Sequence, residues 1–241
     1  MEIGQHISQR YNQELENIRT RVLKMGALVE SQAEDAVKAL LERDGNLAKK
    51  VASSDYKINR LEVEIDEECT QVIARRQPAA SDLRLVIAVV KVITDLERIG
   101  DEAEKIASYS IKLAKKPPLS AMHSTLSHLS ELVLGMLHEA LDAFARMDTD
   151  KALEIIARGS SINKEFNDLS RLLITYMMED THNIKRALRV IWCARSLERI
   201  GDHSRNICEY VVFLVKGKDI RHTDLQEILA EHFPDDDDDN D

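Results

Sequence analysis

A pair of acidic side chains occurs twice, each time within a hexamer that the sequence repeats without change. Residues 96–101 and 197–202 both read Leu-Glu-Arg-Ile-Gly-Asp. On a helix, the glutamate and the aspartate of each hexamer are four residues apart and lie side by side on one face. The resulting pairs are Glu97 with Asp101 and Glu198 with Asp202. Two adjacent carboxylates offer the hard oxygen ligands that suit Mg, Mn, Ca or iron better than zinc.

The position of these pairs on their helices favours a cation site. At about 100° per residue, each pair lies at the border of the apolar stripe of its helix, where like charges need a cation, an arginine or a shared proton. The alternative is a charged flank on which the two glutamates form ion pairs with Arg98, Lys105, Arg199 or Arg205. The hexamer also repeats a glycine, which costs about 1 kcal/mol relative to alanine inside a helix. We expect Gly100 and Gly201 to allow the close approach of another helix.

Further acids could complete such a site. Glu62 and Asp66 repeat the same spacing on the preceding helix, and Glu104 extends the first pair by one turn. Weaker candidates on other helices are Asp35, Glu139 and Asp142. All of these except Glu104 are second-tier candidates, since exposed acids are common on any helical surface. A ferritin-like di-iron site needs two Glu-x-x-His spacings on separate helices, and the sequence has only Glu179 with His182.

The sequence contains no motif that predicts catalysis. It has no GxxxxGK[ST], HExxH, GxSxG or GxGxxG. Its three cysteines, Cys69, Cys193 and Cys208, lie on apolar stripes and are expected in the core. We therefore predict a protein that is not an enzyme. The alternative is a metal-dependent phosphohydrolase, which would need metal ions about 4 Å apart and a cluster of arginines for phosphate.

The composition and the periodicity predict an all-α protein. Of 241 residues, 44% are hydrophobic and only 4% aromatic, with 8 Gly and 4 Pro. Apolar residues recur at steps of three and four between the few helix breakers. Six long helices are expected, at about residues 5–43, 46–76, 80–115, 120–147, 149–179 and 182–216.

The repeated hexamer belongs to a longer internal duplication. The hexamer returns after 101 residues, and four residues of the first half return after 104: Ala39, Asp44, Ala48 and Ile58 match Ala143, Asp148, Ala152 and Ile162. Each repeat spans three helices, which is a whole domain rather than a solenoid unit. The prediction is two tandem three-helix bundles, at residues 1–116 and 119–219, separated by Pro117 and Pro118. Residues 220–241 form an acidic tail that we expect to be disordered.

The charge and the hydropathy pattern exclude several classes of protein. The net charge of −10 argues against a nucleic-acid-binding protein, since such domains are usually basic. The N-terminus lacks the apolar region of a secretory signal. The most apolar stretch, residues 83–96, is interrupted by charges and is too short to cross a membrane. We therefore expect a cytoplasmic protein that reaches the membrane only through partners.

Three segments together resemble the PhoU family, the accessory proteins of bacterial phosphate-specific transport. These segments are QPAASDLR at 77–84, the two hexamers, and NICEYVVFLVKGKDIRH at 206–222. The resemblance covers about residues 5–222 and implies two three-helix bundles in one chain, which often forms a homodimer. It also implies negative regulation of the phosphate regulon. The implied partners are the ATPase subunit of the phosphate ABC transporter and the phosphate sensor histidine kinase.

The resemblance also concerns the acidic pairs. Some family members bind multinuclear metal clusters at matching positions, which implies Mg, Mn or Fe at Glu97 with Asp101 and at Glu198 with Asp202. Arg205 stands where the first repeat has Glu104, so we expect the second site to hold fewer ions or bind them more weakly. For partner binding, the weak candidates are Arg146 and Asp148, in a turn that the pattern places at the surface. The alternative for this turn is an ordinary helix end.

Overall fold

The computed structural model describes residues 9–118 and 122–221, and these residues form helices without any strand. The elements are α1 (Gln9–Leu41), α2 (Gly45–Ala52), α3 (Tyr56–Arg76), α4 (Ala80–Leu113), α5 (His123–Arg146), α6 (Thr149–Glu179), the short 3-10 helix η2 (Thr181–Asn183) and α7 (Ile184–Lys216). The all-α prediction is confirmed. The predicted tail lies mostly outside the described residues.

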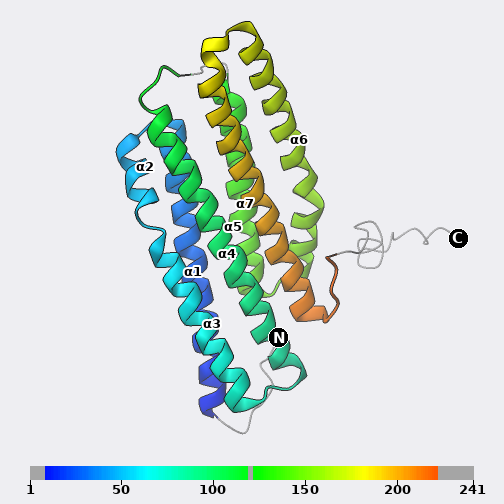
Figure 1. The fold of residues 1–241 in the computed structure, drawn as a ribbon. Coiled ribbons are helices and arrows are strands. Elements are labelled where there is room, and N and C mark those ends of the chain that lie inside the picture. The colour runs from blue at the N-terminus through cyan, green and yellow to red at the C-terminus, as the bar shows by residue number, and fades with distance from the viewer. Residues whose placement is uncertain (1–8, 119–121, 222–241) are drawn as a thin grey trace, which may run out of the picture.

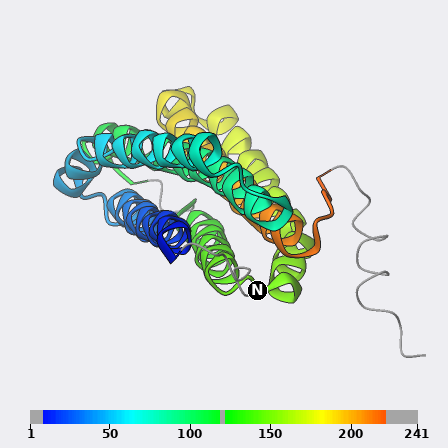
Figure 2. The same ribbon diagram turned by 90° about the horizontal axis from the view of Figure 1, so that it is seen from below.

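The long helices run along one common axis and form two layers (Figures 1 and 2). One layer has the order α3, α4, α7, α6, in which each helix packs against the next. The other layer consists of α1, which packs on α3 and α4, and α5, which packs on α6 and α7. The first bundle is thus α1 to α4 and the second is α5 to α7, and a single hydrophobic core extends through both.

One predicted helix is wrong: the segment 46–76 is broken into α2 and α3. The hydroxyls of Ser53 and Ser54 donate to the carbonyls of Lys50 and Val51, at 3.0 and 2.9 Å. These local bonds compete with the helical ladder and end α2, because serine favours such contacts over the helix interior. The equivalent part of the second repeat continues unbroken through α6. The last predicted helix also differs, since η2 precedes α7.

The turn that precedes the second helix has the same structure in both repeats. The side chain of Asp44 accepts from the backbone N–H groups at the start of α2, and Asp148 does so at the start of α6. The residue before each aspartate is left-handed, with φ of 61° at Arg43 and 57° at Met147. Asp44 and Asp148 are therefore N-caps, and their match in the duplication has a structural reason.

The two repeats meet at α4 and α7 through equivalent positions. Nδ1 of His203 lies 2.6 Å from Oδ1 of Asp95. The offset of 101 residues relates Asp95 to Ser196 and Glu102 to His203. The Ser196 side chain forms a hydrogen bond with Glu102, so the same pair of positions is in contact a second time. The offset of 101 residues also relates Lys91 to Trp192 and Tyr109 to Tyr210. Lys91 lies over the ring of Tyr210, and the ring of Tyr109 lies beside that of Trp192. The interface thus resembles that of a twofold-symmetric dimer, built within one chain.

The core contains all three cysteines, as the sequence predicts. Cys69, Cys193 and Cys208 are fully buried and form no disulfide. Burial raises the pKa of each thiol, that of Cys69 to about 12, so the thiolate is disfavoured. Among the described helices, none has a stretch both long and apolar enough to span a bilayer.

Candidate metal centre

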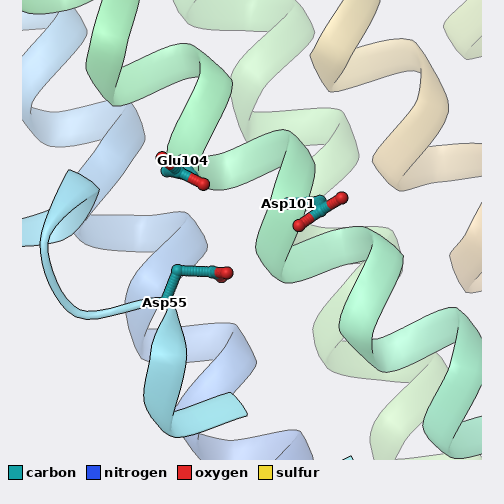
Figure 3. Close-up of side chains that lie close together, drawn as sticks. All are labelled: Asp55, Asp101 and Glu104. Atoms are coloured by element: carbon teal, nitrogen blue, oxygen red, sulfur yellow. The ribbon is translucent and has the colours of Figure 1, made fainter. Parts of the chain in front are cut away.

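Three carboxylates converge between the start of α3 and the middle of α4 (Figure 3). Asp55 immediately precedes α3, while Asp101 and Glu104 lie one turn apart on α4. One carboxylate oxygen from each residue lies within 4.8 Å of the other two. Asp55 is buried and the other two are half-buried. This donor set consists only of carboxylate oxygen, which suits a hard cation such as Mg or Mn.

The break between α2 and α3 places Asp55 at this site. Its carboxylate accepts a hydrogen bond of 3.1 Å from the side-chain amide of Gln32, a buried residue of α1 that also donates to the Gly100 carbonyl at 3.3 Å. A Cβ atom on Gly100 would lie only 3.1 Å from Oδ1 of Asp55. The glycine of the first hexamer therefore makes room for the carboxylate, and Gln32 fixes the orientation of the carboxylate.

The acids around this trio resist ionisation. Burial, followed by the charges of Asp101 and Glu62, raises the pKa of Glu97. Burial and the charge of Asp66 likewise raise the pKa of Glu62. For Asp101 and Glu104, burial again raises the pKa, with the charge of Asp55 as the next cause. The shifts share one physical cause, since several partly buried carboxylates lie close together.

Five acids of this cluster form no ion pair within the part of the chain that the structure describes. Among the described residues, none forms a hydrogen bond or an ion pair of 4 Å or less with Glu62, Asp66, Glu97, Asp101 or Glu104. Lys105 instead binds Glu102, at 3.0 Å. The ion-pair alternative is thus wrong for Glu97. Because half-buried carboxylates need compensation by a cation or a proton, the residues present fit a bound metal ion.

The second acidic pair has a different environment. Glu198 is buried and forms an ion pair of 2.8 Å with Arg195, while its other oxygen, Oε2, has no hydrogen-bond partner. Burial raises the pKa of Glu198, against the charge of Arg195. Arg199 forms its ion pair with Glu102, at 2.9 Å, and acts on Glu198 only through its charge. Glu198 is thus in an ion pair, but its partner is Arg195 and not one of the four basic residues expected from the sequence.

The second-tier acids fall into two groups. Glu139 forms ion pairs with Arg158 and Lys151, and Asp142 pairs with Arg146 at 2.8 Å, as expected for surface acids. Glu62 and Asp66 lie near the trio, as their electrostatic effects show, whereas Asp35 is a half-buried residue of α1 outside it. The turn proposed for partner binding is exposed at Arg146, and Asp148 has a structural role as an N-cap.

Asp55 was missed by the sequence analysis. A continuous helix over 46–76 gave no reason to place its side chain beside α4. The duplication carried a usable signal, because Ile58 matches Ile162 and the same offset of 104 residues aligns Asp55 with Gly159. A charged residue aligned with glycine, one turn before a matched isoleucine, marks a position where the two repeats differ in sequence.

The fold and the site define a class of protein: a duplicated α-helical bundle whose first repeat carries a cluster of carboxylates. The PhoU domain matches the chain twice, at residues 22–110 and 126–211. The chain therefore belongs to the PhoU family. Its two matches correspond to the two bundles, although the domain boundaries expected from the sequence remain a prediction.

Named relatives are similar over nearly the whole chain. The phosphate-specific transport system accessory protein PhoU homolog of Pseudomonas putida is 51% identical, over 94% of this chain and 88% of its own length. PhoU of Escherichia coli K12 is 45% identical, over 95% of this chain and 96% of its own length. The crystal structure of PhoU from Pseudomonas aeruginosa matches with a TM-score of 0.84 and 50% identity, over 86% of this chain and all of that chain. These relatives are accessory proteins by name.

A structure from a more distant organism has the same fold. The phosphate transport system regulatory protein PhoU of Streptococcus pneumoniae matches with a TM-score of 0.78 at 30% identity, over 87% of this chain and 98% of that one. Its name describes a regulator rather than an enzyme. The resemblance to the PhoU family that the three sequence segments indicated is thus confirmed.

Proposed function

We propose that this chain is a cytoplasmic, non-enzymatic regulator that represses the phosphate regulon and modulates phosphate transport. It does so by contacting the ATPase subunit of the phosphate ABC transporter and the phosphate sensor histidine kinase, as a homodimer. The observation that carries this proposal is the similarity to accessory proteins of phosphate transport over 94% of the chain. The relation to the membrane is indirect, through these two partners.

The arrangement of the bundles supports an adaptor. The helices of both repeats pack into one body through buried contacts between α4 and α7. A rigid body with two similar halves can hold two partners in a fixed relation. Transmission of the transporter state to the kinase then requires different affinities for the partners in their two states.

We further propose that the first repeat binds Mg, Mn or Fe. The five unpaired acids on α3 and α4 support this, together with Asp55. A divalent ion there would neutralise clustered charge and hold the start of α3 against α4. Asp55, Asp101 and Glu104 would be the ligands, with Glu97 and Glu62 next to them.

The regulatory proposal is tested with an alkaline phosphatase reporter in a bacterium that lacks its own PhoU gene. Expression of this chain in high phosphate should restore repression. A variant with alanine at Glu97, Asp101, Glu198 and Asp202 should lose repression while its circular dichroism stays helical. If the folded, expressed wild-type chain leaves the reporter fully active, the proposal is wrong. If the four-alanine variant represses normally, the acidic pairs have no part in signalling.

The phosphohydrolase alternative has less support in the structure. Of the two arginines adjacent to the glutamates, Arg199 is engaged by Glu102 at 2.9 Å, and Arg98 is exposed. The described residues thus show no cluster of arginines at the trio. Hydrolysis of p-nitrophenyl phosphate by the Mn-loaded wild-type chain, with loss of hydrolysis in Asp101→Asn, would favour this alternative instead.

A further inference from the structure

The two repeats differ at the residues that build the metal centre. The offset of 104 residues aligns Gln32 with Met136 and Asp55 with Gly159. The offset of 101 residues aligns Glu104 with Arg205, while Asp101 keeps its match in Asp202. Three of the four residues that form or orient the trio are thus changed together.

The structure shows that these replacements are also in contact. A Cβ atom on Gly159 would lie 3.6 Å from Cδ of Arg205 and 3.8 Å from Cε of Met136. At the corresponding place in the first repeat, the side-chain amide of Gln32 donates a hydrogen bond to the Asp55 carboxylate. The aliphatic stem of Arg205 thus lies over Gly159, where the first repeat has a carboxylate. Met136 has no donor with which to orient one.

The remaining charges of the second repeat agree with this replacement. Glu198 already has a cation, since Arg195 binds it at 2.8 Å. The positions of Glu62 and Asp66 are taken by Phe166 and Ser170. The guanidinium of Arg195 lies 5.5 Å from the centre of the Phe166 ring, which adds a cation–π contact. Arg205 has a carboxylate partner as well, since its Nε lies 3.6 Å from Oε1 of Glu209. The second repeat thus has fewer of the carboxylates that line the first site, and two of its glutamates pair with arginines.

We propose that arginines replace the metal ion in the second repeat, with Arg205 over Gly159 and Arg195 on Glu198, and that metal binding is confined to the first repeat. A guanidinium supplies positive charge and hydrogen-bond donors but no ligand for a metal ion. A divalent ion beside Arg205 would be repelled by the charge of the guanidinium. Of the three positions that correspond to the trio, only that of Asp202 still has a carboxylate. This inference deepens the metal binding proposed above and assigns different roles to two halves of common origin.

The test converts the second repeat back into the form of the first. The full-length chain is stripped with EDTA and titrated with MnCl₂ by calorimetry, with electron paramagnetic resonance to count bound Mn²⁺. The Gly159→Asp/Arg205→Glu double variant should bind at least one more ion per chain than the wild type. The Gly159→Ala/Arg205→Lys variant is the matched control, since it keeps the cation and should gain none. Circular dichroism establishes that each variant is folded.

Single substitutions in the wild-type background locate the native site. Asp101→Asn should abolish Mn²⁺ binding, whereas Asp202→Asn should leave the number of bound ions unchanged. Loss of an ion in Asp202→Asn would overturn the inference, as would a folded double variant without additional binding. If the wild type binds no Mn²⁺ but the double variant does, the role of Arg205 stands and the metal proposal for the first repeat fails. The regulatory function is measured separately, by the reporter.

Discussion

Cδ1 of Ile58 lies 2.9 Å from the position that a Cβ atom on Gly100 would occupy. The corresponding residues of the second repeat lie in the same way: Cδ1 of Ile162 is 2.8 Å from the position of a Cβ atom on Gly201. The glycine of each hexamer thus admits the isoleucine of the neighbouring helix, as the sequence analysis expected. Both isoleucines are buried, so the two repeats share this close helix contact.

Gly100→Ala should therefore lower the free energy of unfolding by about 1–2 kcal/mol, since overpacking exceeds the gain in helix propensity. The measurement is urea denaturation followed by circular dichroism. Adding Ile58→Val removes Cδ1 and should recover part of the loss. Gly135→Ala is the control, because nothing lies within 4 Å of its Cβ position, and it should stabilise by up to about 1 kcal/mol. Equal effects of the two glycine substitutions would contradict the packing argument.

The raised pKa of Glu97 leads to a prediction about pH. The folded state favours the protonated form, so this contribution to stability is present below the unfolded pKa and is lost as pH rises through the folded pKa. At pH 7 in EDTA, Glu97→Gln should stabilise the protein by on the order of 0.5 kcal/mol, since solvent screens a half-exposed charge.

At pH 4 the same substitution should have almost no effect, because the wild-type carboxyl is then largely protonated. Thermal denaturation at both pH values measures the difference. Glu154→Gln is the control for a glutamate on the exposed face of α6. A Glu97→Gln variant that is less stable than the wild type at pH 7 without metal would show that the charge of Glu97 is favourable.

The sequence was sufficient for the fold class because helical periodicity and caps are local signals. The repeated hexamer also located α4 and α7 correctly as the helices that carry the acids. What it could not show was the break between α2 and α3, since an interruption of three residues, 53–55, is a weaker signal than the periodicity around it. Asp55 reaches Gly100 only because of that break. Likewise, the pairing of Arg195 with Glu198 depends on rotamers that no repeat pattern encodes.

The pair of the buried Asp95 and the half-buried His203 should contribute strongly to the contact between the repeats. Asp95 also accepts from the side chain of Asn206 at 3.1 Å and forms a hydrogen bond with Tyr210. Burial, followed by the charge of Asp95 and this hydrogen bond, raises the pKa of Tyr210. His203→Ala leaves a buried carboxylate short of one partner and should cost about 1–3 kcal/mol in urea denaturation. Arg146→Ala, which breaks an exposed pair, should change stability by no more than about 1 kcal/mol. If His203→Ala lowers the free energy of unfolding as little as Arg146→Ala does, the pair of Asp95 and His203 does not stabilise the contact between the repeats.

Substitutions at Asp148 can distinguish its structural role as an N-cap from a role in partner binding. As the N-cap of α6 it accepts from the backbone N–H of Lys151 at 3.0 Å, and Asp148→Ala should cost about 1 kcal/mol of stability. Asp148→Ser retains an acceptor for the cap and removes the negative charge, so its stability should stay near that of the wild type. Asp44→Ala is the matched control, because Asp44 caps α2 in the same way in the other repeat.

The reporter assay then distinguishes the two roles. If Asp148 acts only as a cap, Asp148→Ser represses alkaline phosphatase as well as the wild type, and Asp148→Ala and Asp44→Ala have equally small effects. If the carboxylate also contacts a partner, Asp148→Ser loses repression although its thermal stability is unchanged, and Asp44→Ala does not. Since both caps have the same local geometry, a difference between them in signalling cannot come from the helix end itself. Only this second outcome would support the turn of Arg146 and Asp148 as a partner contact.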